Sequence, residues 1–382
     1  MSAVVGAAAL HKALRQLADV RLPHAYLGLV LVLWGGTLGA FASPLSTKAG
    51  VIAAYALHEV ALIPTFVLTL HWGGEGRRAA AMQMAIYLTL GAMAGLAGLL
   101  LCDFSPGQVG PSAAGLILLG FGALVSLFPF HSWAAPGYSA APTPVSMIHA
   151  GALKKFGLAI LIAFVVGNLG AWSDLLLWLA LGNTVLLGIV CLAQRDLKQL
   201  VSWSSVAHMG PIFLGLWVAD RTGQADGLHA AVLLMAAHGL SAAALFALAH
   251  EVRTKAGTYR IDELGGLAAR TPVLAACFIA ASMASIGLPG FGNFWGEFGI
   301  FLALRDQAPW VQVATASTVV VSAVYMLRAV AAVFHGPLNP ELAARRDGGD
   351  IGWADRLGPL ALLLASLALG CLPLLVTRLL RP

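Results

Sequence analysis

The chain has 382 residues, of which 59% are hydrophobic and only 10% are charged, and its formal net charge is +5. Charged residues supply about a quarter of an ordinary soluble domain, so this composition excludes a soluble globular enzyme and predicts a membrane protein. The basic residues are scattered through short segments between apolar runs, which argues against nucleic-acid binding.

Residues 1–24 precede the first apolar run, and we expect a short amphipathic helix here on the cytoplasmic surface. Leu10, Leu14 and Leu17 recur at helical spacing, with basic residues on the other faces. A frayed terminus is the alternative. The segment lacks an apolar core followed by a small-residue cleavage site, so no cleavable signal peptide is expected.

Eleven apolar runs follow, each long enough to cross about 30 Å of hydrocarbon as a helix. They show no strand alternation, and only helices or closed barrels can span a bilayer. The sequence therefore predicts an all-α polytopic membrane protein. Its spans are expected near 26–42, 49–72, 79–101, 113–132, 145–168, 172–193, 200–218, 228–250, 272–304, 309–334 and 357–377.

Two spans contain helix breakers. After span four the chain reads HSWAAPGYSAAPTPVS, in which three prolines forbid a continuous helix. Span nine contains GLPGFGNFWGEF at 287–298, with four glycine or proline breakers in its first six residues. In lipid, such backbone survives only where protein buries it or where it lines a watery cavity. We therefore expect broken helices of the kind that transporters use, with a plain proline kink as the alternative.

Six ionisable residues lie inside the predicted spans, where a charge costs about 2.5–3.5 kcal/mol and marks a functional pathway by default. They are Glu59, Lys154, Lys155, His208, His238 and Glu297. Lysine, glutamate and histidine can all exchange protons when buried, so a water-linked row of them predicts a proton pathway. Structural ion pairs, and histidines bonded to a nearby hydroxyl or carbonyl, are the alternatives.

The two adjacent lysines are not equivalent candidates. Neighbouring helical residues point about 100° apart, so we expect only one of them to face the pathway. Lys155 is the first choice and Lys154 the weaker one.

No cofactor is expected in this chain. The four cysteines form no CxxC or Cys/His ligand spacing, and no glycine-rich phosphate loop follows a strand. The sequence therefore implies neither a metal site, a nucleotide nor a haem.

Lysine and arginine divide unequally between the two predicted sides of the membrane. Of the 22, fifteen lie on the side of the N-terminus, five on the other side and two within the bilayer. By the positive-inside rule we place the N-terminus in the cytoplasm and the C-terminus outside.

Five motifs in unbroken order carry a resemblance to a known family. They are HEVALIPTF, PFHSWAAPGYSAAPTPVSMIHAGALKKFG, DLKQLVSWSSVAHMG, AHGLSAAALF and GLPGFGNFWGEF, between residue 50 and about 304. The series resembles the antiporter-like subunits of respiratory complex I and the Mrp cation antiporters. The Glu-x-x-Leu-Ile-Pro pattern and the carboxylate in the final Gly-Glu-Phe resemble the M-type subunit; other members usually carry lysine at that last position.

The resemblance implies roles for the candidate residues. It makes Glu59 the charge-coupling glutamate, Lys155 the central lysine, His208 and His238 relay histidines, and Glu297 the exit-side carboxylate. It also implies two inverted five-helix repeats, either spans 2–6 and 7–11 or a one-helix shift of that division. The implied partners are other antiporter-like and quinone-site subunits of a membrane arm, surrounded by lipid, with redox chemistry in other subunits.

The chain departs from that family in two places. The family has fourteen spans, whereas only one span precedes Glu59 here, so the first three are expected to be absent. Seven residues before His131 the family carries a lysine that pairs with the glutamate, and this chain has Leu124. The first part of the family's row of charged residues therefore lacks its lysine here. The later part, Lys155, His208, His238 and Glu297, is present.

These observations predict a surface helix at 1–24, an antiporter-like transmembrane domain at 25–335, and a cytoplasmic loop with the last transmembrane helix at 336–382. The expected function is a proton-translocating, M-type subunit of a complex I-type NADH:quinone oxidoreductase in the bacterial inner membrane. A non-conducting structural subunit of the same arm is one alternative. Another is a subunit of an Mrp-type cation antiporter, a membrane-bound hydrogenase or an inorganic-carbon transporter.

Overall fold

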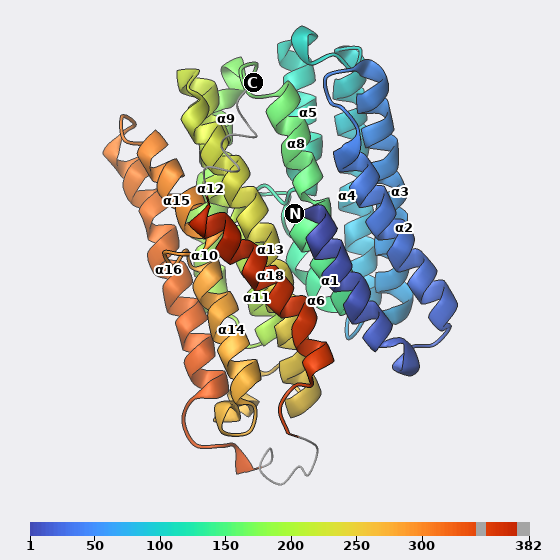
Figure 1. The fold of residues 1–382 in the computed structure, drawn as a ribbon. Helices are drawn as coiled ribbons and strands as arrows, with labels where there is room; N and C mark the ends of the chain where they lie inside the picture. Colours follow the sequence, from blue (N-terminus) through green and yellow to red (C-terminus); the bar gives the residue numbers. More distant parts are fainter. Residues whose placement is uncertain (341–348, 373–382) are drawn as a thin grey trace.

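The computed structural model describes residues 1–340 and 349–372, and its elements there are helical, with one isolated bridge between Asp196 and Arg260. Figure 1 shows an elongated bundle. The helices are α1 (Ser2–Arg15), α2 (Pro23–Ala42), α3 (Lys48–Trp72), α4 (Arg77–Leu101), α5 (Pro111–Leu124), α6 (Ala134–Ala140), α7 (Thr143–Ile148), α8 (Lys155–Phe164), α9 (Ser173–Leu181), α10 (Leu187–Leu192), α11 (Leu197–Ala207), α12 (Met209–Thr222), α13 (Ala225–Ala256), α14 (Pro272–Ser285), α15 (Gly292–Ala303), α16 (Pro309–Phe334) and α18 (Trp353–Cys371). Two π-helical turns, η3 (His149–Leu153) and η5 (Gly182–Leu186), join α7 to α8 and α9 to α10.

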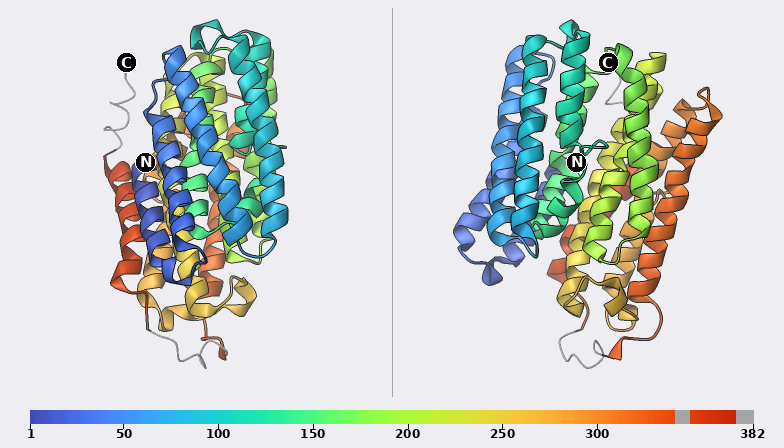
Figure 2. Two further views of the ribbon diagram at one scale, coloured as in Figure 1. Left: turned by 90° about the vertical axis from the view of Figure 1, so that its right-hand side faces the viewer. Right: turned by 180° about the vertical axis from the view of Figure 1, so that it is seen from behind.

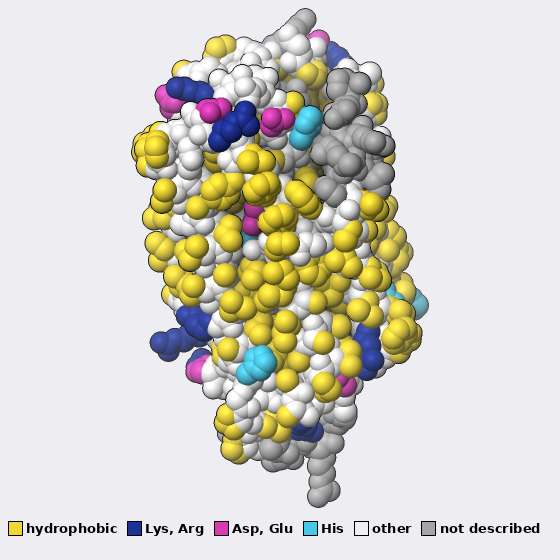
Figure 3. All heavy atoms as spheres, turned by 60° about the vertical axis from the view of Figure 1, so that its left-hand side comes forward, with side chains coloured by type: hydrophobic (Ala, Val, Ile, Leu, Met, Phe, Trp, Pro, Cys, Tyr) yellow, Lys and Arg dark blue, Asp and Glu magenta, His cyan; other side chains and the backbone are white. Residues whose placement is uncertain are grey.

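The predicted all-α membrane fold is confirmed. Eight stretches of the described chain are long and apolar enough to cross a membrane: Pro23–Ala42, Lys48–Trp72, Arg77–Leu101, Thr143–Phe164, Gly170–Leu192, Ala225–Ala256, Pro309–Phe334 and Trp353–Cys371. Figure 3 shows the corresponding surface, a broad hydrophobic band with most charged side chains toward its two ends. The last predicted span, 357–377, continues into residues outside the described ranges.

The other three predicted spans are divided into shorter helices. The first is α5, which has only 14 residues and is followed by a turn before α6. In the second, α11 ends and α12 begins on either side of His208. In the third, residues Ile286–Phe291 separate α14 from α15. The break in span nine lies at the glycine cluster as predicted, whereas the first break begins earlier than expected, because α5 ends at Leu124 and Pro136 lies inside α6. The two breaks fall in spans four and nine, five spans apart and so in opposite directions, which is what inverted five-helix repeats require.

A neighbouring element contacts the backbone at each break. After α5, the buried Asn183 of η5 donates to the carbonyls of Ser126 and Val206 and accepts from the backbone N–H of Phe128 at 2.7 Å. Between α14 and α15, a Cβ on Gly370 would lie 2.1 Å from the carbonyl oxygen of Gly290, so α18 packs directly on the broken backbone. At the first break the protein therefore supplies hydrogen-bond partners that lipid cannot, and at the second it packs closely over the backbone.

The bundle has two groups of helices with a closely packed seam between them. Figure 2 shows α2, α3 and α4 at one side and α14, α15 and α16 at the other. Between the groups, a Cβ on Gly239 of α13 would lie 2.3 Å from the carbonyl oxygen of Gly151 in η3. Small residues allow such close approach between membrane helices, and here they bring α13 against the π turn.

The N-terminal segment forms a helix whose buried face consists of small residues. α1 packs against α7 and α18. Val5, Ala9 and Ala13 are fully buried, whereas Leu14 is 49% exposed. The small residues face the bundle because they let α1 approach it closely.

A buried ion pair fixes α1 to the bundle. Lys12 binds Glu251 of α13, and both side chains are nearly enclosed. Nearby, Arg15 Nε lies 3.2 Å from Asp355 Oδ1 of α18 at the surface.

We expect Lys12→Met to lower the free energy of unfolding by about 3–5 kcal/mol, because it leaves the Glu251 carboxylate buried without its cation. The double variant Lys12→Met/Glu251→Leu should recover most of that loss. Thermal unfolding of the purified protein, followed by fluorescence-detected size exclusion, measures both. Equal destabilisation by the single and double variants would contradict the ion-pair interpretation.

The seam gives a second prediction. Gly239→Ala forces α13 away from η3 and should cost about 1–3 kcal/mol of stability through overpacking. Gly28→Ala is the matched control, because a Cβ there meets nothing within 4 Å. The higher helix propensity of alanine should make the control neutral or slightly stabilising. The same unfolding assay compares the two variants, and an equal response would exclude a tight seam.

Candidate functional site

Four candidate residues meet in the centre of the bundle, from three different elements. Lys154 and Lys155 follow η3, His208 lies between α11 and α12, and His238 lies in α13; none is more than 1% exposed. Both lysine side chains are fully buried, so burial alone does not choose between them. The π turn places the Lys154 N–H on the carbonyl of His149, five residues back, and this wider turn lets both side chains reach the interior.

The two lysines have different partners. The Lys154 ammonium donates to the carbonyl and the hydroxyl of Ser205, at 2.8 and 3.0 Å, and lies 5.3 Å from the ring centroid of Tyr138. The Lys155 ammonium donates to the carbonyl of Ala150 in the π turn. Lys154 therefore contacts α11, while Lys155 bonds its own helix.

The Ser205 hydroxyl connects Lys154 to a histidine pair. Its oxygen lies 3.1 Å from His238 Nε2, so it can accept from Lys154 and donate to the imidazole. The rings of His238 and His208 stack with centroids 5.4 Å apart. His208 Nδ1 donates to the carbonyl of Ser204 at 2.8 Å, which leaves Nε2 as the acceptor nitrogen. That Nε2 has no hydrogen-bond partner among the described residues.

Glu297 lies in α15, just after the broken segment, and is 8% exposed. A Cβ on Gly287 would lie 2.4 Å from its Oε2, so the carboxylate rests against the glycine of the break. One turn earlier, the Asn293 amide donates to the Ser241 hydroxyl at 3.4 Å, and that hydroxyl bonds the carbonyl of His238 at 3.3 Å. These bonds join the backbone of α13 to α15, and Glu297 Oε1 itself has no hydrogen-bond partner among the described residues.

Glu59 lies apart from this group. Its side chain is 35% exposed and borders a cavity of about 240 Å³ between α3 and α4. The residue of α3 that faces the interior is His58, whose ring stacks on Phe156 at 4.8 Å. Leu124, 5% exposed, packs against the start of α8, where a Cβ on Gly157 would lie 3.2 Å from its Cδ2.

Three further polar candidates, Ser205, His58 and His149, were not predicted. Each lies within a quoted motif that also holds a predicted residue, and His58 directly precedes Glu59. His149 is fully buried in η3 against Trp133 and Tyr138, with ring centroids 5.4 and 5.3 Å apart. The available signal was a histidine in the same apolar run as Lys154 and Lys155.

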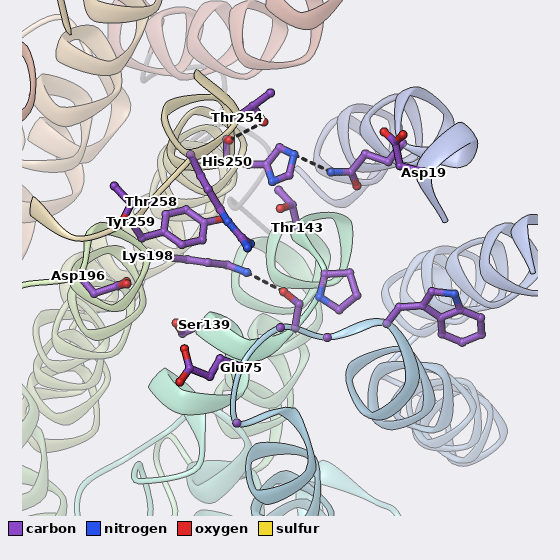
Figure 4. Close-up of a pocket in the computed structure, with 18 of the residues that line it drawn as sticks. Asp19, Glu75, Ser139, Thr143, Asp196, Lys198, His250, Thr254, Thr258 and Tyr259 are labelled. Atoms are coloured by element: carbon purple, nitrogen blue, oxygen red, sulfur yellow. Dashed lines mark hydrogen bonds between the residues drawn. The ribbon is translucent and has the colours of Figure 1, made fainter. Parts of the chain in front are cut away.

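A cavity of about 980 Å³ opens at one end of the bundle, and Figure 4 shows its lining. Lys198 points into it and donates to the carbonyl of Ala141 at 2.6 Å. Burial raises the pKa of Tyr259 to about 12, so its phenol stays neutral beside Arg253. Thr143 also lines the cavity, and His149 follows it by about 9 Å of helix. α7 thus leads from this cavity to the π turn.

The described residues contain no group of three His, Cys, Asp or Glu side chains arranged to hold a metal ion.

Ser205→Ala should destabilise the protein by about 1–3 kcal/mol, because it leaves the Lys154 ammonium with one acceptor and His238 Nε2 with none. Ser202→Ala is the matched control on the same helix, since its hydroxyl bonds only the carbonyl of Lys198. Thermal unfolding compares the two. A larger loss in the control would mean that the serine bridge contributes little.

Comparisons with known proteins agree with this geometry. The family model described as NADH:quinone oxidoreductase/Mrp antiporter, TM matches residues 110–323. A NAD(P)H-quinone oxidoreductase chain 4 of a Synechococcus species is 30% identical, across 93% of this chain and 71% of its own length. A chain 4 of a Picosynechococcus species is 31% identical, across 93% and 70%.

Solved structures show the same arrangement. A chain of respiratory complex I from Thermus thermophilus superposes with a TM-score of 0.83 at 27% identity, covering 97% of this chain and 79% of that one. A chain of the Mrp complex from Dietzia sp. DQ12-45-1b has a TM-score of 0.83 at 19% identity, covering 98% and 80%, and shows the fold alone. The predicted resemblance to M-type subunits is confirmed, and the chain belongs to the NADH:quinone oxidoreductase/Mrp antiporter family of membrane subunits.

Proposed function

We propose that this chain is a proton-translocating, antiporter-like subunit in the membrane arm of a complex I-type NADH:quinone oxidoreductase. The observation that carries the proposal is the buried hydrogen-bonded run from Lys154 through Ser205 to His238, at the centre of a bundle with two broken helices. The family and its chain 4 members supply the context. Redox chemistry then belongs to other subunits, and this chain moves protons without a cofactor.

The proton pathway follows the contacts in the site. An ammonium proton of Lys154 passes to the Ser205 oxygen as the serine proton passes to His238 Nε2. Lys155, buried beside Lys154, supplies a second ammonium group. From His238 the proton passes to the stacked His208, and Glu297 at the second break is proposed as the carboxylate on the exit side.

Charge at the bundle surface would drive these steps. Glu59 borders an open cavity on the outer face of α3, where a neighbouring membrane-arm subunit can act on it. The related solved chains come from multisubunit assemblies, complex I and the Mrp complex, which supports partners of this kind. Lipid covers the remaining apolar surface.

We place the protein in the bacterial inner membrane, with its N-terminus in the cytoplasm and its C-terminus in the periplasm. The unequal division of lysine and arginine supports this orientation. The large cavity, lined by Lys198, Arg253 and Arg260, then opens to the cytoplasm. Four arginines of the count, at 345, 346, 378 and 381, lie outside the described residues.

A non-conducting structural subunit is the second candidate, and Leu124 favours it. Its apolar side chain packs on α8 where the resemblance implies a lysine, so α5 offers no cation to Glu59. A subunit of an Mrp-type cation antiporter is a further alternative, supported by the fold that this chain shares with a chain of the Mrp complex.

Lys155→Met and Glu297→Gln should each lower the proton-to-electron ratio of the intact complex in sealed proteoliposomes, because each removes a group that exchanges protons. The ratio is measured from proton uptake with quinone reduction followed in parallel. Arg15→Gln is the control, because its exposed ion pair lies outside the run. An unchanged ratio in both variants, with the complex assembled, would favour the structural subunit.

A further inference from the structure

Asn183 of η5 bonds the backbone of two separate helix interruptions. Its Oδ1 accepts from the N–H of Phe128 at 2.7 Å and its Nδ2 donates to the carbonyl of Ser126 at 2.9 Å, both in the segment after α5. The same Nδ2 donates to the carbonyl of Val206 at 3.2 Å, two residues before His208. One fully buried amide therefore joins the first break to the turn that carries the histidine.

An asparagine amide suits this position because it carries two donors and an acceptor on one planar group. The two N–H bonds of Nδ2 serve two carbonyls, while Oδ1 serves one N–H. Rotating the amide by half a turn would place its oxygen against two carbonyl oxygens, so the hydrogen bonds determine the orientation of the group. A hydroxyl, a carboxylate or an apolar side chain could not make all three bonds at once.

The π turn η5 brings Asn183 to this position. The turn packs against α11, α12 and α16. On the side of the first break, a Cβ on Gly182 would lie 2.8 Å from the ring of Phe128, so the missing side chain lets η5 approach that segment closely. Single π turns inside α-helices occur frequently at functional sites.

The interruption at His208 has its cause in the sequence. Pro211 has no N–H for the carbonyl of Ala207, and its ring clashes with that carbonyl in a regular helix. His208 accordingly has a ψ of −8°, against about −42° in a regular α-helix. Because the regular helical bonds are interrupted here, contacts from other elements fix where this turn lies.

The position of the turn decides where the His208 ring lies. Its Nδ1 donates to the carbonyl of Ser204 at 2.8 Å, and the ring stacks on His238 with centroids 5.4 Å apart. Tyr325 of α16 donates its hydroxyl to Ser204 Oγ at 3.1 Å. The bond from Asn183 holds the backbone between Ser204 and His208 from the side of η5.

We propose that Asn183 is a positioning residue for the proton pathway. It holds the turn that carries His208 at the separation from His238 that proton transfer requires, and it ties this turn to the first break. The inference rests on the proposed function and deepens it. Asn183 itself neither gains nor loses a proton. A displacement of about 1 Å can lower the rate of a chemical step about 100-fold, so loss of the amide should impair the transfer.

The test compares Asn183→Leu with Thr184→Val in the assembled complex. Leucine has the branched shape of asparagine without its hydrogen-bonding atoms. We expect Asn183→Leu to lower the proton-to-electron ratio to the value of His208→Gln. Thr184 is the matched control, because it is the next residue of η5, is equally buried, and bonds the carbonyl of Ala180 in its own helix. Valine keeps its shape, so Thr184→Val should keep the wild-type ratio.

A double variant shows whether Asn183 acts through His208. Two residues that act on one step have effects that do not add. We therefore expect Asn183→Leu/His208→Gln to have the same ratio as His208→Gln alone. A further decrease in the double variant would mean that Asn183 affects the pathway independently of His208, and it would overturn the positioning role.

The ring nitrogens of His208 give a readout that a purely structural role would not change. Solid-state NMR of the full chain in lipid bilayers, with isotope-labelled histidine nitrogens, identifies the His208 signals as those lost in His208→Gln. We expect these signals to shift in Asn183→Leu and to stay in place in Thr184→Val. If Asn183→Leu fails to assemble, Asn183→Asp replaces it with the same expected results, since aspartate keeps an acceptor for Phe128 and loses the paired N–H donors.

The outcomes separate this inference from the proposed function. A reduced ratio in His208→Gln, with a wild-type ratio and unshifted His208 signals in the Asn183 variant, would overturn the positioning role and leave the proposed function standing. Wild-type ratios in His208→Gln, Lys155→Met and Glu297→Gln would overturn the proposed function and with it a role in proton transfer. A reduced ratio, no further loss in the double variant and shifted His208 signals would establish the positioning role.

Discussion

The close contact between α13 and the π turn η3 sets the geometry of the whole site. Gly151 and Gly239 let two backbones meet where any side chain would separate them. That approach brings His238 of α13 within reach of Ser205, and the wider turn of η3 delivers both lysines into the same interior. Removing the contact would separate lysines from histidines without altering any ionisable residue.

The broken helices add polar atoms that the rest of the bundle must satisfy. Asn183 does so for the segment after α5, and the small residues of α18 cover the segment before α15. At both breaks protein atoms surround the interrupted backbone in place of water, because hydrocarbon offers no hydrogen bonds. An amide side chain therefore holds the first break, while close packing of Gly370 covers the second, where Glu297 rests against Gly287.

Composition and helix breakers predicted the all-α membrane fold and the interruption in span nine, since each depends on local sequence. The buried face of α1 was not predictable, because leucine periodicity says nothing of which surface another helix will contact. The inward direction of both lysines depended on a π turn that the pattern SMIHAGALKKFG does not reveal. His58 was overlooked beside Glu59 because only the three-dimensional packing shows which of the two neighbours faces the interior.

The half-exposed position of Glu59 has a consequence for biogenesis. Its neighbours Val60 and Ile63 are 44% and 64% exposed, so this carboxylate stands on an apolar outer face. A charge in that setting costs about 2.5–3.5 kcal/mol on insertion scales. A newly inserted chain would carry this penalty until another surface shields the group. The residue thus supplies a free-energy difference between solitary and joined subunits, and so a thermodynamic bias toward assembly.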